Sequence, residues 1–212
     1  MHLEILNQNQ NQNQKNLLPF ISQFKREYYL VGGTAIALHI GHRESIDFDL
    51  FKLSSLRKND IYEKISHSKI GYKFGYENYE QLNLTLNEVK FTFFSFLHKI
   101  PTNAEIKGVI KIPDLLTLAA MKAFALRRRA KWKDYMDLYF ILKDFYSFQE
   151  IANTATLLFG EQFSEKLFKM QLCYFKEISY TEEVSYLILN PPTEAEIQEF
   201  LINISLEGLG FD

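Results

Sequence analysis

Two aspartates separated by one residue, Asp47 and Asp49, are the strongest candidates for chemistry in this sequence. They stand in the alternating segment 46–51, which predicts a β-strand, and alternation directs both carboxylates to one face, about 7 Å apart. Carboxylate oxygens at this spacing suit a hard divalent cation such as Mg²⁺ or Mn²⁺. An edge strand with two solvated aspartates has the same pattern, so the neighbouring residues must distinguish a metal site from a solvated edge.

A glycine pair, Gly32 and Gly33, precedes the aspartates and separates an expected strand at 28–31 from an expected helix at 35–40. Glycines allow close approach of the backbone, and the first turn of a helix offers N–H groups to a phosphate. Thr34 is expected to cap this helix. The glycine pair and the Asp-x-Asp motif together predict a site for a nucleotide phosphate and a metal.

The turn between the two motifs carries two further candidates, Arg43 and Ser45. Ser45 lies two residues before Asp47, so its hydroxyl can lie beside the same site. Arg43 can contact phosphate oxygens in a bidentate manner. An ordinary turn serine and a surface arginine would have the same pattern.

Charged residues also interrupt the apolar stripes of two later helices. On a helical wheel Lys122 falls among leucines, and Asp134 lies between Leu138 and Ile141. Opposite charges on inward faces indicate either a shared functional site or a buried structural ion pair. Asp137 lies near the edge of the same face and is a possible additional member.

These motifs resemble the AbiEii-type abortive-infection nucleotidyltransferase toxin family. The segments that carry the resemblance span residues 30–142 and are Leu30-Val31-Gly32-Gly33-Thr34-Ala35, Arg43-Glu44-Ser45-Ile46-Asp47-Phe48-Asp49-Leu50, Ala120-Met121-Lys122 and Lys133-Asp134-Tyr135-Met136-Asp137-Leu138. The resemblance implies an enzyme that transfers a nucleoside monophosphate (NMP) from a nucleoside triphosphate (NTP) to an acceptor. It also implies the toxin of a toxin–antitoxin or phage-defence system, with an antitoxin protein as partner and RNA such as tRNA as a plausible acceptor.

The resemblance assigns roles to the candidate residues. Asp47 and Asp49 would bind Mg²⁺ or Mn²⁺, and Lys122 would neutralise phosphate charge, with Asp134 orienting it or assisting the acceptor. The matching serine, here Ser45, has a catalytic or acceptor role in some relatives. The NTP would be held by Gly32, Gly33, Thr34, Arg43 and Lys122.

One departure from the wider nucleotidyltransferase pattern is Thr92, which stands on the expected neighbouring strand where many members carry a third carboxylate. Asp134 is an alternative source of that charge. Two other functions remain open. One is a non-catalytic protein that binds a nucleotide or a partner on the same scaffold, and the other is a small-molecule nucleotidyltransferase of the antibiotic-modifying sort.

The order of the elements predicts an α/β (α+β) fold with an amino-terminal mixed β-sheet lobe and flanking helices, followed by a helical lobe that completes the cleft. We expect an Asn/Gln-rich extension at 1–16, the α/β lobe at 17–112 and the helical lobe at 113–212. Strands are expected near 70–76, 82–86 and 89–96. Helices are expected at 56–66, 113–129, 133–143, 148–159, 164–178 and 193–204.

Composition excludes several other classes. With 212 residues, 47% of them hydrophobic, and a net charge of −2, the chain is expected to fold and not to coat nucleic acid generally. The basic run at 127–133 is a local exception. A single cysteine, Cys173, fits a reducing compartment, and no stretch approaches the length of a membrane span, so a cytoplasmic location is expected. No Walker A loop, serine-hydrolase elbow or paired-histidine metal motif is present.

Overall fold

The computed structural model describes residues 12–127 and 130–207 of the chain. It divides into two compact units, Met1–Asp114 and Leu115–Asp212. We call them the sheet unit and the helical unit. Within the described residues, no helix combines the length and the apolar character needed to cross a lipid bilayer.

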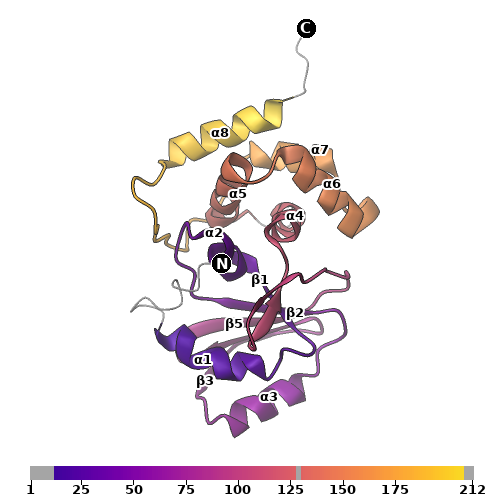
Figure 1. The fold of residues 1–212 in the computed structure, drawn as a ribbon, viewed down its shortest axis with the longest axis vertical. Helices are drawn as coiled ribbons and strands as arrows, with labels where there is room; N and C mark the ends of the chain where they lie inside the picture. The colour runs from indigo at the N-terminus through magenta and orange to yellow at the C-terminus, as the bar shows by residue number, and fades with distance from the viewer. Residues whose placement is uncertain (1–11, 128–129, 208–212) are drawn as a thin grey trace. The chain divides into compact units, whose positions relative to one another are not determined.

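The sheet unit is built on a mixed β-sheet (Figure 1). Within its described residues the sheet has seven strands in the order β3-β4-β5-β2-β1-β7-β6. The strands are β1 (Tyr29–Val31), β2 (Phe48–Lys52), β3 (Tyr72–Glu77), β4 (Gln81–Leu86), β5 (Val89–Ser95), β6 (Ala104–Ile106) and β7 (Ile110–Ile112). The pairs β2–β5 and β1–β7 are parallel, and the other four neighbouring pairs are antiparallel.

The described helices of this unit are α1 (Gln12–Ser22), α2 (Gly32–Ile40) and α3 (Lys58–His67). The ring of Phe20 on α1 meets that of Phe91 on β5 with centroids 6.0 Å apart, so α1 packs on the face of the sheet that carries Phe48 and Leu50. The burial of Ile61 and Ile65 gives α3 an apolar face of its own. The core of the unit is therefore rich in aromatic rings.

The helical unit contains α4 (Leu115–Leu126), α5 (Trp132–Asp144), α6 (Phe148–Phe159), the short 3₁₀ helix η3 (Gly160–Gln162), α7 (Glu165–Leu172) and α8 (Glu194–Leu206). Stacked Phe124 and Phe159, with centroids 4.1 Å apart, join α4 to α6. The hydroxyl oxygens of Ser147 and Thr193 accept backbone N–H groups and define the starts of α6 and α8.

This architecture confirms the predicted fold class of a mixed sheet with helices followed by a helical region. Some details differ from the expectation. The strands β6 and β7 lie in a segment for which the sequence predicts no strand, since each has only three residues. The helix expected at 164–178 ends at Leu172.

Thr34 does not cap α2, contrary to the prediction from sequence. The N-cap of α2 is Val31, which has no side-chain cap, and Thr34 lies inside the first turn. Its hydroxyl instead donates to the backbone carbonyl of Asp47. The side chain therefore ties the helix to the strand that carries the aspartates.

Candidate functional site

The carboxylate of Asp49 lies directly against Gly32. Gly32 is the first residue of α2 and has a φ of +72°, and a Cβ built on it would be 2.1 Å from Asp49 Oδ2. Val31 and Asp49 are partners in the antiparallel β1–β2 register. Only a residue without a side chain leaves room for the carboxylate here, which explains the glycine that the motif requires.

Gly33 makes the same kind of room for Arg43. A Cβ on Gly33 would lie 2.4 Å from an Nη atom of Arg43 and 3.3 Å from Ser45 Oγ. Arg43 is a buried residue, not a surface arginine, and its guanidinium also donates to the carbonyl of Glu44 at 2.9 Å. The guanidinium and the Ser45 hydroxyl are therefore packed on the first turn of α2.

Thr34 links this turn to the loop that precedes β2. Its Oγ1 lies 2.9 Å from Ser45 Oγ, and its own proton goes to the Asp47 carbonyl, so Ser45 is the donor to Thr34. One side chain of α2 thereby fixes Ser45 and Asp47 together.

Asp47 and Asp49 lie on the same face of β2. Phe48 and Leu50 are fully buried, whereas the two aspartates are partly exposed, as alternation along a strand requires. Asp47 lies immediately before the first residue of β2. Two hard oxygen donors beside the first turn of a helix suit a divalent cation that shares its coordination with phosphate oxygens.

Thr92 occupies the position next to Asp49 on the parallel strand β5. Asn83 on β4 follows in the same row, as the partner of Thr92. Within the described residues, no group of three or more His, Cys, Asp or Glu side chains is placed to hold a metal. The donor set seen here is therefore two carboxylates with neighbouring neutral oxygens. Asn83 was not predicted, because only the strand register reveals it.

Replacing Gly32 by alanine tests the contact with Asp49. We expect Gly32→Ala to destabilise the protein by more than the 1–3 kcal/mol typical of left-handed backbone, because its Cβ also displaces the Asp49 carboxylate. The matched control is Gly108→Ala, where φ is +76° but an added Cβ meets nothing within 4 Å. Thermal melting of the two variants measures the difference, and equal losses would show that the Asp49 contact has no energetic weight.

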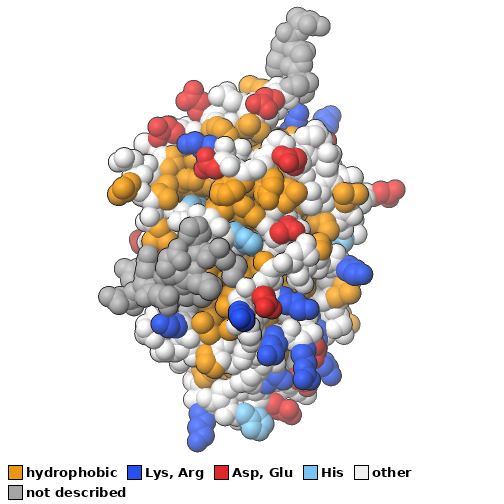
Figure 2. Space-filling view, in the orientation of Figure 1, with side chains coloured by type: hydrophobic (Ala, Val, Ile, Leu, Met, Phe, Trp, Pro, Cys, Tyr) orange, Lys and Arg blue, Asp and Glu red, His pale blue; other side chains and the backbone are white. Residues whose placement is uncertain are grey.

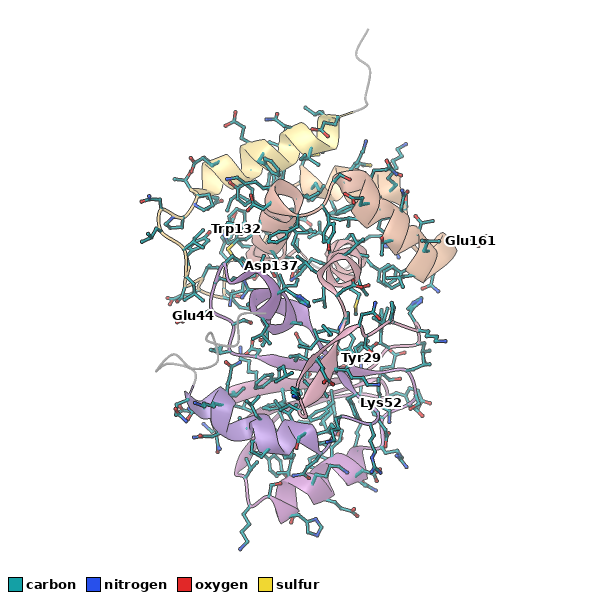
Figure 3. All side chains as sticks on the ribbon, viewed as in Figure 1. Tyr29, Glu44, Lys52, Trp132, Asp137 and Glu161 are labelled. Carbon is teal, nitrogen blue, oxygen red and sulfur yellow. The ribbon has the colours of Figure 1, made fainter. Side chains whose placement is uncertain are left out.

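In the helical unit, Lys122 binds two carboxylates. Its Nζ donates to Asp134 Oδ1 at 2.8 Å and to Asp137 Oδ2 at 2.7 Å. Lys122 and Asp134 are 6% and 3% exposed, and Asp137 is fully buried. Asp137 and Trp132 both belong to α5 (Figure 3). Asp137 is thus a central member of the cluster, whereas the helical wheel predicts it near the edge of the inward face.

Part of the basic run at 127–133 is ion-paired within the helical unit. Lys131 Nζ lies 2.6 Å and Lys133 Nζ 3.6 Å from the carboxylate of Glu182. Arg128 and Arg129 lie outside the described residues. The segment that follows α7 therefore meets the start of α5.

A second concentration of positive charge lies in the sheet unit and was not predicted. A hollow of about 390 Å³ is bordered by the residues after α1, by Lys52 and by α3. Its cationic side chains are Lys25, Arg26, Lys52, Arg57 and Lys64, against the carboxylates of Glu27 and Asp60. In Figure 2, blue side chains gather where Figure 3 labels Lys52.

Glu27 and the buried Lys52 hold the inner wall of this hollow together. The ammonium of Lys52 lies 2.5 Å from Glu27 Oε2, and an Arg57 Nη lies 2.8 Å from Oε1. The hydrogen bond from Lys52, with a contribution from Arg57, lowers the pKa of Glu27. Because these charges are spread over residues 25–64, no window of the sequence reveals them.

The structure gathers the predicted site residues into two groups. In the sheet unit, seven lie around the start of α2: Gly32, Gly33, Thr34, Arg43, Ser45, Asp47 and Asp49. In the helical unit, Lys122, Asp134 and Asp137 form the buried ionic cluster.

Comparison with known proteins gives these groups a context. The family model described as "Nucleotidyl transferase AbiEii toxin, Type IV TA system" matches residues 20–205 of this chain. The uncharacterized protein aq_aa25 of Aquifex aeolicus (strain VF5) is 31% identical over 125 residues, which cover 55% of this chain. The match covers 58% of the length of that curated relative.

Two solved structures share the fold. MenT4, a nucleotidyltransferase toxin from Mycobacterium tuberculosis H37Rv, has a TM-score of 0.60 and 12% identity, with 91% of this chain and 80% of that chain covered. JHP933 from Helicobacter pylori has a TM-score of 0.52 and 13% identity, covering 94% and 90%. At these identities the likeness concerns the fold alone.

Proposed function

The chain belongs to the AbiEii family of nucleotidyltransferase toxins of type IV toxin–antitoxin systems, and we propose from this premise that it transfers an NMP from an NTP to an acceptor. The observation that carries the proposal is the contact between the Asp49 carboxylate and Gly32 at the start of α2. It brings a metal-binding oxygen and a phosphate-binding helix start together.

The binding step rests on this chain's own groups. The backbone N–H groups of the first turn of α2 would bind the triphosphate, and the Arg43 guanidinium packed on Gly33 adds positive charge. Asp47 and Asp49 would hold Mg²⁺ or Mn²⁺. When bound, the cation neutralises phosphate charge as a Lewis acid.

In the transfer step an acceptor hydroxyl oxygen attacks the α-phosphorus. The bond from that phosphorus to the bridging oxygen breaks, pyrophosphate leaves, and the acceptor proton passes to solvent. Catalysis of this kind consists mainly of positioning and charge stabilisation. Thr34 and Ser45 contribute by holding the loop before β2 in register with α2.

Lys122 is proposed to neutralise phosphate charge during the reaction. Asp134 and Asp137 hold its ammonium group in one position through two short hydrogen bonds. The ammonium group of Lys122 also compensates the two carboxylates, which would be costly to bury without a cation.

The direct test incubates the pure protein with each α-labelled NTP, Mg²⁺ and total RNA. Label that moves to RNA with release of pyrophosphate supports the proposal and identifies both the nucleotide and the acceptor class. Absence of label on any macromolecule, while Mg·NTP still binds, would contradict an RNA acceptor and leave a non-catalytic nucleotide-binding protein or a small-molecule nucleotidyltransferase. The non-catalytic alternative has one observation in its favour, which is Thr92 beside Asp49.

RNA is the acceptor that we propose, with an antitoxin protein as the partner that restrains the activity. The basic hollow supports a polyanionic acceptor, because five cationic side chains there face only two carboxylates. A phosphodiester backbone bound at such a surface releases counterions, so its affinity falls steeply with salt.

Charge reversal in the hollow tests this choice of acceptor. We expect Lys25→Glu/Arg26→Glu to raise the KM for RNA about tenfold and to reduce its salt dependence, without changing the KM for NTP. The matched control is Lys166→Glu/Lys176→Glu, which reverses two exposed lysines of the helical unit. Equal effects of the two double variants would mean that the hollow has no special role in binding RNA.

A further inference from the structure

Gln14 connects the Asn/Gln-rich tract to the proposed site. It is the last residue of the alternating run at 7–14 and lies in α1. Only 1% of it is exposed, and its Nε2 donates to the backbone carbonyl of Ser45 at 3.0 Å. A residue of a low-complexity tract is thus buried against the loop that leads to Asp47.

Ser45 is held from two helices at once. Gln14 of α1 binds its carbonyl, and Thr34 of α2 accepts its hydroxyl. Arg43 and Asp47 stand two residues away on either side. A shift of the Ser45 peptide therefore moves both the guanidinium beside Gly33 and the start of β2.

Stability alone does not explain an amide at this position. The other polar atom of the side chain, Gln14 Oε1, is buried and has no hydrogen-bond partner among the described residues. A buried polar atom without a partner lowers stability. Methionine has nearly the same length and no such atom, so it avoids this cost and gives up only the hydrogen bond to Ser45. The remaining distinction of glutamine is its N–H group, which holds Ser45.

We propose that Gln14 is a positioning residue, which sets the loop at 43–47 so that Arg43, Ser45 and Asp47 keep their places at the start of α2. The proposal rests on the proposed function for its effect on transfer. Its effect on the loop is independent of any activity. The amide acts through the Ser45 carbonyl and needs no contact with the substrate.

Two variants separate positioning from stability. We expect Gln14→Met to melt close to the wild-type temperature, because loss of the unpartnered Oε1 offsets loss of the hydrogen bond to Ser45. It should nevertheless transfer label about tenfold more slowly, through kcat more than KM. The matched control is Gln12→Met, which changes an exposed glutamine of the same helix whose amide donates to Asn16. It should leave transfer unchanged.

Gln14→Glu supplies a signature that a structural role would not produce. An ionised carboxylate repels the Ser45 carbonyl, whereas a protonated one donates to it, and burial raises the pKa of such a group. The activity of Gln14→Glu relative to wild type should rise about threefold or more as the pH falls from 8 to 5.5. Effects of pH on the other site residues are common to both proteins and cancel in the ratio.

Hydrogen exchange tests the same point without substrate. Amides 43–47 should exchange faster in Gln14→Met than in wild type or Gln12→Met, in the nucleotide-free full chain. If wild type transfers no label but this difference is present, the proposed function fails and the positioning stands. Equal exchange in all three proteins would overturn the proposal. So would a wild-type transfer rate in Gln14→Met together with an activity of Gln14→Glu, relative to wild type, that does not change with pH.

Discussion

Asp47→Asn/Asp49→Asn is expected to reduce Mg²⁺-dependent transfer from NTP by about a thousandfold or more, as removal of key electrostatic groups does in other enzymes. Asparagine keeps the shape of the side chain, so the contact with Gly32 survives and the loss is one of charge. Both aspartates are partly exposed, and their replacement should leave the fold intact. Label transfer measures the activity, calorimetric titration with Mg·NTP measures nucleotide binding, and circular dichroism measures whether the fold is retained.

A control of the same chemistry is Asp144→Asn, which removes an exposed carboxylate at the end of α5. It should transfer label at the wild-type rate. If the double variant binds Mg·NTP as wild type does, the two aspartates are not the metal ligands, and the non-catalytic alternative gains support.

Lys122→Met is expected to have the second-largest effect, on both stability and transfer. It leaves the buried carboxylates of Asp134 and Asp137 without their cation, which costs about 3–5 kcal/mol. Thermal melting and label transfer, measured below the melting temperature, report the two losses separately. Lys143→Met, which removes an exposed lysine of α5, is the control.

Because Asp137 is a second carboxylate bound to Lys122, it determines which variant can distinguish a structural role of the cluster from a role in transfer. Removing Lys122 and Asp134 together would leave Asp137 buried without its lysine, so the informative variant is Lys122→Met/Asp134→Asn/Asp137→Asn. If the cluster is structural only, this triple variant should recover stability and transfer. Recovery of stability with transfer still absent is expected if Lys122 acts on the nucleotide.

Much of the fold and of the site could be predicted from local patterns. Strand alternation at 46–51 correctly places Asp47 and Asp49 on one face, and the inward wheel positions of Lys122 and Asp134 correspond to a real contact. Both cases depend on a single element whose periodicity is regular. Local geometry is then enough to orient the side chains.

The features that could not be predicted depend on contacts between elements. Thr34 has the sequence character of an N-cap, but the proximity of Asp47 gives its hydroxyl a better partner. Gln14 is connected to the site only by its hydrogen bond to Ser45, 31 residues later in the sequence. Asn83 joins the site row only through the register of β4 with β5. No pattern within one segment contains this information.

The pairing of Val31 with Asp49 also bears on how the protein folds. The residues around the start of α2 come from one stretch of fewer than twenty residues, Gly32 to Asp49. Closing a loop of that length costs little chain entropy, so β1, α2 and β2 can associate before distant strands join. Thr92 and the rest of β5 must then add to a β1–α2–β2 unit in which the glycines already face the carboxylate. The arrangement is thus of low contact order, and its geometry can form early in folding.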